Sequence, residues 1–347
     1  MNLLVIRMSA MGDVALTLPV IRSVLESYPD LNITLVTREQ FFPFFKNIER
    51  LDVVIADVKG KHKGIPGLFR LFLELRKSRK INTVLDLHNV LRSLILSFFF
   101  RITGVSVFKI NKGRKEKKQL TIKKDKTFRQ LMHTTQRYAE VFGNAGYPIK
   151  LSEHKNWFNE NEISEQFLQQ NNLLPKNTTW IGIAPFSKHR EKMWPLEKME
   201  QVIQYFSKKD IKLFLFGGGI NEISQLNNLN KYPNTYIVAG ILPLHQELAL
   251  IRQLDLMISM DSANMHMAAL SGIPVVSIWG ATHPYAGFGP LNTNEKYIVQ
   301  IPHEKLDCRP CSVFGNKPCW RGDHACMEWI MPEDVIQMAE KVLNKDK

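Results

Sequence analysis

The acid and hydroxyl at Asp261 and Ser262 are the strongest candidates for chemistry, because they directly follow an apolar run at residues 256–259. Small side chains from Ala263 onward predict that a helix begins there. The first turn of a helix presents free backbone N–H groups and a partial positive charge, which suits an anion such as phosphate. His266 follows about one helical turn later. A lone histidine there is commonly part of the core, but these neighbours favour a place in the site.

A second candidate is the basic loop at residues 187–194, which ends at Pro195, a residue typical of the first turn of a helix. Lys192 or Arg190 could neutralise a pyrophosphate, with the Ser187 hydroxyl as a hydrogen-bond donor to it. Surface lysines are also common, so this loop decides little without the others.

A third candidate is the glycine run at residues 217–219, which follows another apolar run and precedes Glu222. Glycine lets a ligand approach the backbone closely, but it also simply permits a tight turn. Glu222 could accept hydrogen bonds from the hydroxyls of a ribose.

Asp13 closes the loop at residues 9–13, near the N-terminus. The loop lacks the Gly-x-Gly-x-x-Gly pattern of dinucleotide sites, so that function has little support here. Asp13 is either a helix-capping acid or a general base that deprotonates an acceptor hydroxyl. From this loop alone both interpretations remain open.

Apolar runs that alternate with amphipathic ones must position these loops. Strands alternating with helices at this spacing predict parallel βαβ units, with ligands at the carboxyl ends of the strands. We therefore predict an α/β protein with two Rossmann-like, doubly wound domains that face a crevice, at residues 1–165 and 166–347. The expected strands are residues 3–7, 32–37, 53–56, 83–87, 180–185, 212–216, 236–238, 256–259 and 275–279, and the expected helices include 14–27, 195–207 and 244–254.

The 347 residues carry a formal net charge of +13. The excess is concentrated at residues 101–130, which contain eleven Lys or Arg residues and only two acids, Glu116 and Asp125. Such a run is usually a solvated face, but it also attracts phosphate on anionic lipids or nucleic acid. No aromatic-interleaved or base-reading module accompanies it, which favours lipid over nucleic acid. No secretory signal or run long enough to span a bilayer is visible. We expect a cytoplasmic protein, at most peripheral on the inner membrane.

The four cysteines, Cys308, Cys311, Cys319 and Cys326, all lie in one C-terminal stretch. Disulfides are rare in the cytosol, which leaves free thiols or a structural metal. The first pair has the spacing of half a zinc site, whereas the second pair is more widely spaced than in common zinc knuckles. Reduced packing cysteines are favoured over bound zinc.

Several of these loops together resemble glycosyltransferase family 9, the lipopolysaccharide heptosyltransferases. Residues 261–284 contain Asp-Ser-x-x-x-His, Gly-x-Pro-Val-Val and Trp-Gly-Ala-Thr-His-Pro in that order. Residues 7–14 resemble the family's N-terminal motif, and residues 192–195 resemble its Lys-x-Trp-Pro. The Cys-x-x-Cys tail is also similar to that of many members. Many of them have Gly where this chain has Ala263, and the added methyl restricts how closely the backbone approaches a phosphate.

The resemblance implies a GT-B fold and an inverting transfer without a metal or cofactor, from a nucleotide-sugar donor, ADP-heptose, to a lipid-linked glycan acceptor in the lipopolysaccharide inner core. It implies that Asp13 is the general base. For donor binding it implies Lys192 and Ser187 at the pyrophosphate, Glu222 at the ribose, Asp261 at the sugar hydroxyls, and Ser262, Ala263 and His266 near the phosphates. The anionic membrane surface as a partner is inferred from charge alone.

Two alternatives are kept. A related GT-B transferase could use another sugar nucleotide or a protein acceptor, and it would share the fold and the pyrophosphate contacts. A nucleic-acid-binding protein with a zinc-like cysteine cluster would use the basic run, and its binding would weaken steeply with salt. That second alternative leaves the four ordered motifs unexplained.

Overall fold

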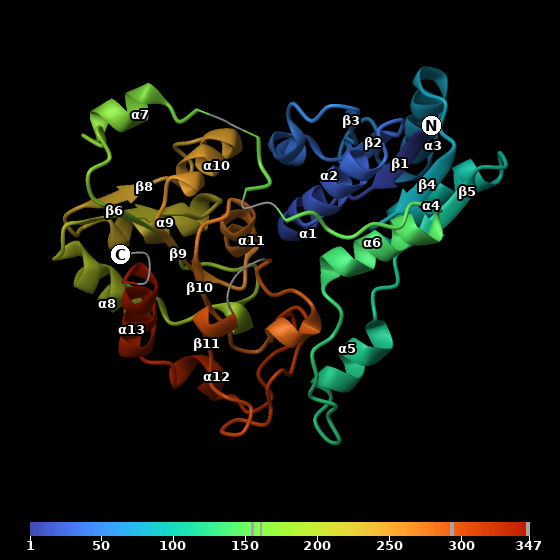
Figure 1. Ribbon diagram of the computed structural model, residues 1–347. Helices are drawn as coiled ribbons and strands as arrows, with labels where there is room; N and C mark the ends of the chain where they lie inside the picture. Colours follow the sequence, from blue (N-terminus) through green and yellow to red (C-terminus); the bar gives the residue numbers. More distant parts are fainter. Residues whose placement is uncertain (154–155, 160–161, 292–294, 345–347) are drawn as a thin grey trace. The chain divides into compact units, whose positions relative to one another are not determined.

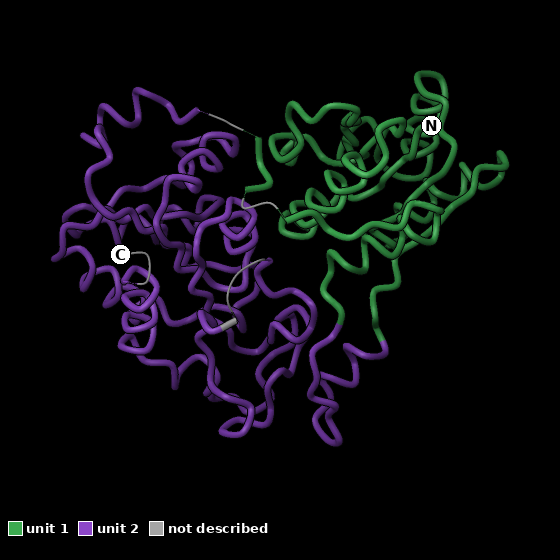
Figure 2. The backbone as a smooth tube through the Cα atoms, viewed as in Figure 1, with its two compact units in different colours: residues 1–114, 132–159 green, residues 115–131, 160–347 purple. Residues whose placement is uncertain are grey.

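The computed structural model describes residues 1–153, 156–159, 162–291 and 295–344, and these residues form two compact units. Unit 1 contains residues 1–114 and 132–159, and unit 2 contains residues 115–131 and 160–347 (Figure 2). The sequence predicted two contiguous domains that meet between residues 165 and 166. The chain instead leaves unit 1 at residue 115 and returns to it at residue 132, so the basic segment 115–131 packs with unit 2.

Unit 1 is built on a five-stranded parallel sheet with strand order β3-β2-β1-β4-β5 (Figure 1). The central strand is a continuous apolar run that is fully buried at Leu3, Leu4, Val5 and Ile6, as expected for a parallel strand covered on both faces. The strands are β1 (Asn2–Ile6), β2 (Asn32–Thr37), β3 (Leu51–Ile55), β4 (Thr83–Asp86) and β5 (Ser106–Lys109).

The helices of unit 1 depart from prediction at one place, where the single helix expected at residues 14–27 is two. Pro19 is the second residue of α2, and it has no N–H with which to continue the hydrogen bonds of α1. The helices that begin in unit 1 are α1 (Met11–Ala15), α2 (Leu18–Ser27), η1 (Glu39–Phe45), α3 (Gly64–Ser78), α4 (Leu91–Arg101), α5 (Arg114–Thr121), most of which belongs to unit 2, and α6 (Thr134–Asn144).

Unit 2 contains a six-stranded parallel sheet with strand order β11-β10-β9-β6-β7-β8. Two doubly wound parallel sheets confirm the predicted fold class. The C-terminal helix α13 packs against β9 and α8 and closes the core with buried Val335, Ala339 and Val342. The strands are β6 (Thr179–Ala184), β7 (Ile211–Leu215), β8 (Thr235–Ile237), β9 (Leu256–Met260), β10 (Val275–Ile278) and β11 (Ile298–Val299).

The helices of unit 2 place most of the predicted loops at the carboxyl edge of its sheet. Each loop that follows β6, β7 and β9 leads directly into the next helix, as the βαβ pattern predicts. The helices are α7 (Glu165–Gln170), η2 (Arg190–Lys192), α8 (Leu196–Ser207), α9 (Ile220–Leu229), α10 (Leu244–Arg252), α11 (Ala263–Leu270), η3 (Pro284–Ala286), η4 (Glu295–Tyr297), α12 (Ala325–Glu328) and α13 (Pro332–Leu343).

Several lysines of the basic segment 115–131 make contacts within unit 2. Lys126 donates hydrogen bonds to the carbonyl oxygens of residues 307–309 at 2.8 to 3.0 Å. The Lys117 ammonium lies 4.0 Å from the ring centre of Phe288, and that of Lys123 lies 4.6 Å from the ring of Trp320. These contacts fix the segment on the C-terminal part of the chain.

Within the described residues, every helix is too short or too polar to cross a lipid bilayer.

Candidate functional site

Each sheet has a topological switch point, where the connections of two neighbouring strands run to opposite sides of the sheet. Ligands of open α/β sheets bind outside the carboxyl ends of the strands at this point. In unit 1 it lies between β1 and β4, and in unit 2 between β6 and β9. Asp13 lies in the first turn of α1, which follows β1. After β6, Ser187 lies in the loop and Lys192 at the end of η2, and Asp261 directly follows β9. The predicted residues therefore lie at the two positions where this fold places ligands.

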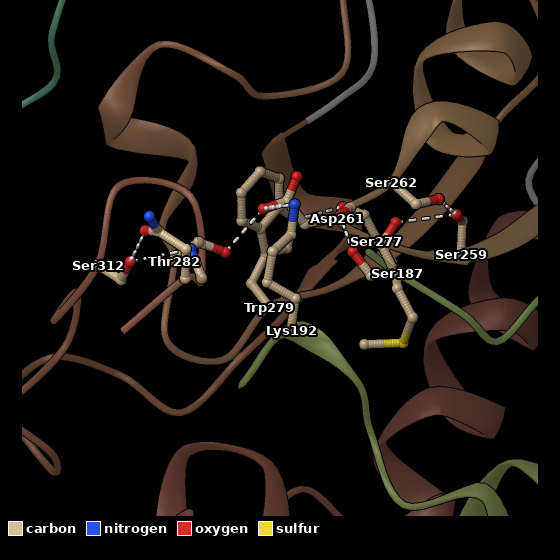
Figure 3. Close-up of polar contacts among 12 residues, drawn as sticks. Ser187, Lys192, Ser259, Asp261, Ser262, Ser277, Trp279, Thr282 and Ser312 are labelled. Atoms are coloured by element: carbon tan, nitrogen blue, oxygen red, sulfur yellow. Dashed lines mark hydrogen bonds and ion pairs between the residues drawn. The ribbon is translucent and has the colours of Figure 1, made fainter. Parts of the chain in front are cut away.

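In unit 2 the side chains of Lys192 and Asp261 meet. Lys192 Nζ lies 3.0 Å from Asp261 Oδ2, and the two side chains are only 14% and 10% exposed (Figure 3). Thr282, from the loop after β10, donates a hydrogen bond of 2.7 Å to the same oxygen. Because an ammonium carries three donors and this pair uses one of them, Lys192 can also bind an anion at the rim of the site.

Three serines form hydrogen bonds next to this pair. The Ser187 hydroxyl donates to the Asp261 carbonyl oxygen at 2.9 Å, which ties the loop after β6 to the loop after β9. The Ser262 hydroxyl lies 3.2 Å from that of Ser259, and it forms no capping bond to α11 in the described structure. The Ser187 hydroxyl therefore uses its one donor to position Asp261, a contact that the sequence did not predict.

Glu222 lies in the first turn of α9, at the end of the neighbouring strand β7. Its Oε2 accepts a hydrogen bond of 2.8 Å from the Gly218 N–H. Partial burial raises the pKa of Glu222, and the Gly218 N–H opposes that rise. A Cβ added at Gly217 would lie 3.3 Å from both Glu222 Oε2 and Phe186, so this glycine makes room for the carboxylate beside the loop after β6.

The two remaining candidates lie in α11. Ala263 is the first residue of this helix, and His266 is buried within it, with 6% of its surface exposed. The structure therefore places Ala263 at the helix N-terminus next to Ser262, as predicted, and His266 inside the fold one turn farther on.

The C-terminal segment supports the loop that carries Thr282. Arg309 is 1% exposed, and its guanidinium donates to the carbonyl oxygens of Gly280 at 2.6 Å, Trp279 at 3.1 Å and Thr282 at 3.2 Å. It also donates to the carbonyl of Ile301 and to the side chain of residue 300. Burial lowers the pKa of Arg309 to about 10, which still leaves it charged at neutral pH.

The same segment also contacts the stem of Lys192. Gly315 has a φ of +72°, and a Cβ at this position would lie 2.3 Å from Cγ and 2.6 Å from Cδ of Lys192. Only glycine accommodates both the backbone conformation and this close approach. The cysteine-rich segment therefore braces the Lys192–Asp261 pair from two sides, through Arg309 and through Gly315.

The cysteines themselves are all free thiols, and all four line one small cavity beside Arg309. Burial raises the pKa of Cys326 to about 12, which keeps this thiol protonated. Among the described residues, no group of three or more His, Cys, Asp or Glu side chains is arranged to hold a metal ion.

In unit 1 the carboxylate of Asp13 pairs with a buried arginine. Arg7 Nη2 lies 2.6 Å from Asp13 Oδ2, and the side chains are 6% and 27% exposed, respectively. Arg7 also donates to the Leu87 carbonyl at 2.7 Å, and the Tyr138 hydroxyl donates to the Asp13 carbonyl at 3.2 Å. Burial is the largest influence on the pKa of Arg7 and acts to lower it, but the charges of Asp13, Tyr138 and Asp86 and the hydrogen bond to Asp13 together outweigh burial and raise this pKa. This ion pair holds the partly exposed carboxylate of Asp13 in one orientation.

A histidine from the neighbouring strand end lies in the same cluster. His88 follows β4, and its Nε2 lies 3.1 Å from the Ser9 hydroxyl, in the loop that leads to Asp13. Burial, followed by the positive charges of Arg7 and Lys112, lowers the pKa of His88 to about 3. His88 is therefore neutral at physiological pH, and it can share a hydrogen bond with Ser9 without adding a charge to the cluster.

Several of these residues were not predicted from the sequence. Arg7 and Thr282 lie inside the family motifs but received no role, although each is a polar residue beside a buried strand end. His88 lies in a strand-to-helix loop that was not considered. The contacts of Arg309 join residues about thirty positions apart, and no local pattern predicts them.

Comparisons with known proteins show the family of this chain. Residues 68–315 match the model of glycosyltransferase family 9 (heptosyltransferase). The chain is 26% identical to lipopolysaccharide heptosyltransferase 1 of Campylobacter coli, over 100% of both chains.

Solved structures show the same fold. The glycosyl transferase family 9 protein of Veillonella parvula has a TM-score of 0.76 at 22% identity, over 99% of this chain and 97% of its own. Escherichia coli heptosyltransferase WaaC with ADP-2-deoxy-2-fluoro heptose has a TM-score of 0.65 at 17% identity, over 98% and 99% of the two chains.

Proposed function

This chain belongs to glycosyltransferase family 9, the heptosyltransferases, and from that premise we propose that it transfers a heptose from ADP-heptose to an inner-core sugar of lipopolysaccharide. The observation that carries the proposal is the braced Lys192–Asp261 pair at the strand ends of unit 2. The acceptor is suggested by the lipopolysaccharide heptosyltransferase that the chain resembles over its whole length, and the donor by the structural relative that binds an ADP-heptose analogue.

We assign donor binding to unit 2. Lys192 neutralises the diphosphate and stabilises the negative charge that develops on the leaving ADP, which is the role of a preorganised cation in such transfers. Lys192 and Thr282 both contact Oδ2 of Asp261, and among the described residues no hydrogen bond reaches Oδ1. That second oxygen accepts from a hydroxyl of the donor sugar. Glu222 serves the ribose.

The N-terminus of α11 completes the donor site. Ser262 and the backbone at Ala263 lie near the phosphates, where free N–H groups favour an anion. His266 supports this turn from within the helix, and Ser187 keeps the Asp261 loop in place through its carbonyl contact.

We assign the general base to Asp13 in unit 1. Its carboxylate takes the proton of the acceptor hydroxyl as that oxygen attacks the anomeric carbon of the donor sugar. The bond from the anomeric carbon to the β-phosphate oxygen breaks, and ADP leaves with the electron pair, so the anomeric configuration inverts. Arg7 orients the Asp13 carboxylate through their ion pair. The positive charge that this step requires comes from Lys192, so the proposed transfer is independent of a metal.

The test is nucleotide release from a panel of ADP-, UDP- and GDP-sugars with and without a lipopolysaccharide acceptor. The proposal predicts ADP release from ADP-heptose only when the acceptor is present. Turnover with another sugar nucleotide or with a protein acceptor would reassign the substrates within the same fold. No turnover with any pair would overturn the proposed function. Because the acceptor is lipid-linked, we also propose that the protein works at the inner membrane surface.

A further inference from the structure

Two neighbouring helices of unit 1, α3 and α4, expose an unusual amount of apolar surface. Six large apolar side chains on them are between 39% and 76% exposed. Clusters of this kind on soluble proteins mark interaction sites, whereas single exposed apolar side chains are ordinary. We call this cluster the α3–α4 apolar face. It consists of Ile65, Phe69, Leu73, Leu91, Leu94 and Phe98.

The six side chains form one surface because of their spacing and the packing of the helices. Those on α3 recur every fourth residue, and those on α4 recur after three and four residues, so each set lies along one side of its helix. The helices touch through Phe99, whose ring centre lies 5.3 Å from that of Phe69 and 5.8 Å from that of Phe72. The core of unit 1 uses the other sides, through Leu71, Leu96 and their neighbours.

The charge around this face is strongly positive. Residues 61–102 contain nine Lys or Arg and only two acids. Of those acids, Asp86 is fully buried and Glu74 pairs with Lys61 at 2.8 Å. Exposed cations stand on the two helices themselves, at Arg70, Arg76, Arg92 and Arg101.

A surface pocket lies where α3 ends. It has a volume of about 370 Å³ and is lined by residues 76–81 together with Phe100 and Val105. Its basic side chains are Arg76, Lys77, Arg79 and Lys80, of which Arg79 also contacts Asp52 at 3.3 Å. Apolar walls beside several cations suit the phosphate and upper acyl region of an anionic lipid.

We propose that the α3–α4 apolar face is the surface by which this protein docks on an anionic phospholipid bilayer. Its apolar side chains enter the boundary between headgroups and acyl chains, and the surrounding cations contact lipid phosphates. A second copy of the chain fits less well, because a two-fold interface would bring the same cations of both copies together. The basic run at residues 101–130 is the weaker choice, since Lys117, Lys123 and Lys126 are engaged within unit 2.

The docking proposal extends the proposed function to a membrane partner, but its test requires neither donor nor acceptor. Flotation of the full chain with vesicles of phosphatidylcholine alone, or of equal parts phosphatidylcholine and phosphatidylglycerol, measures binding directly. We expect binding to the anionic vesicles that weakens with salt. The double variant Leu91→Gln, Phe98→Gln should lose on the order of tenfold or more in vesicle affinity.

A matched control is Ile220→Gln, which removes a side chain that is 87% exposed on unit 2. We expect it to bind vesicles as the wild type does, and both proteins should keep the wild-type thermal midpoint. Equal losses in the control and the double variant would overturn the proposal. So would a wild type that ignores both kinds of vesicle, or a dimer that only the double variant dissociates. Any of these outcomes leaves heptose transfer to a detergent-dispersed acceptor intact, so the two proposals fail separately.

Discussion

The clusters at the strand ends of the two units each contain an ion pair between a basic residue and an aspartate, Arg7–Asp13 in unit 1 and Lys192–Asp261 in unit 2. The proposed function uses the aspartate of the first pair and the lysine of the second. In unit 1 the cation, Arg7, is the more buried partner, and the carboxylate of Asp13 is 27% exposed. In unit 2 the carboxylate of Asp261 accepts a hydrogen bond from Thr282, and the cation is Lys192, whose side chain is 14% exposed against 10% for Asp261. On the proposed roles, the first arrangement offers an oriented acceptor of protons, and the second offers a positive charge for an anion.

The supports of the two pairs differ as well. Arg7 holds Asp13 by direct contact, and Arg7 itself is anchored by a hydrogen bond to one carbonyl oxygen at the neighbouring strand end. The pair in unit 2 depends on a segment far along the chain, through Arg309 and Gly315. On the proposed roles, the base is therefore positioned by strands of its own unit, and the donor cation by the cysteine-rich segment.

Replacing Asp13 with Asn should have the largest effect. The substitution keeps the shape of the side chain but removes the group that takes the acceptor proton, so kcat should fall by roughly 10² to 10⁴. Steady-state ADP release measures this. Glu49→Gln removes an exposed acid elsewhere in unit 1 and should leave kcat unchanged. A kcat for Asp13→Asn within a factor of two of wild type would remove the base from the account.

Replacing Lys192 with Ala should reduce kcat/KM by on the order of 10² to 10³, because one preorganised positive contact to the leaving group is lost. Lys192→Arg keeps the charge and should recover part of the activity. The matched control is Lys188→Ala, which removes an exposed lysine of the same loop. If both alanine variants lose activity equally, the effect is one of general loop charge rather than of the Lys192–Asp261 pair.

Replacing Arg309 with Met should destabilise unit 2 by about 2–4 kcal/mol, because several buried carbonyl oxygens lose their donor. The free energy of unfolding in urea measures this. Arg129→Met, at an exposed arginine of the same unit, should change it by less than about 0.5 kcal/mol. An Arg309 variant as stable as wild type, with unchanged kinetics, would show that the brace does not position Thr282.

The smallest expected effect is a pH dependence of stability. The pKa of His88 in the folded protein is about 3, below its ordinary value of 6.5. His88 therefore binds a proton more readily in the unfolded chain than in the folded one. The stability that comes from burying neutral His88 is present above about pH 6.5 and decreases as the pH falls toward 3. His88→Gln should make the fall in unfolding free energy between pH 7 and pH 5 shallower. His245→Gln serves as the control, and equal slopes in all three proteins would contradict the burial of a neutral His88.

The sequence predicted the fold well because buried parallel strands are continuous apolar runs, and the loops after them follow from the same pattern. Asp13, Lys192 and Asp261 could be found because each follows such a run. The division of the helix at Pro19 was missed although the proline was visible.

Other features were beyond local reasoning. Arg309 and Gly315 act on residues far from them in sequence, and only tertiary packing brings these together. The basic run at residues 101–130 was expected at a membrane from its charge, but charge alone does not reveal that Lys126 binds carbonyl oxygens of unit 2. The spacing of Ile65, Phe69 and Leu73 was visible as a helical pattern, but only the fold shows that this side of α3 remains exposed.

The division of labour between the two charge pairs is tested most directly by the binding of ADP to Asp13→Asn and Lys192→Ala, measured by isothermal titration calorimetry. The account predicts that Asp13→Asn binds ADP as tightly as wild type while its turnover is lost. It predicts that Lys192→Ala binds ADP more weakly by about tenfold or more, since a charge-assisted contact to the diphosphate is removed. Wild-type affinity in Lys192→Ala, or a loss of ADP binding in Asp13→Asn, would contradict it.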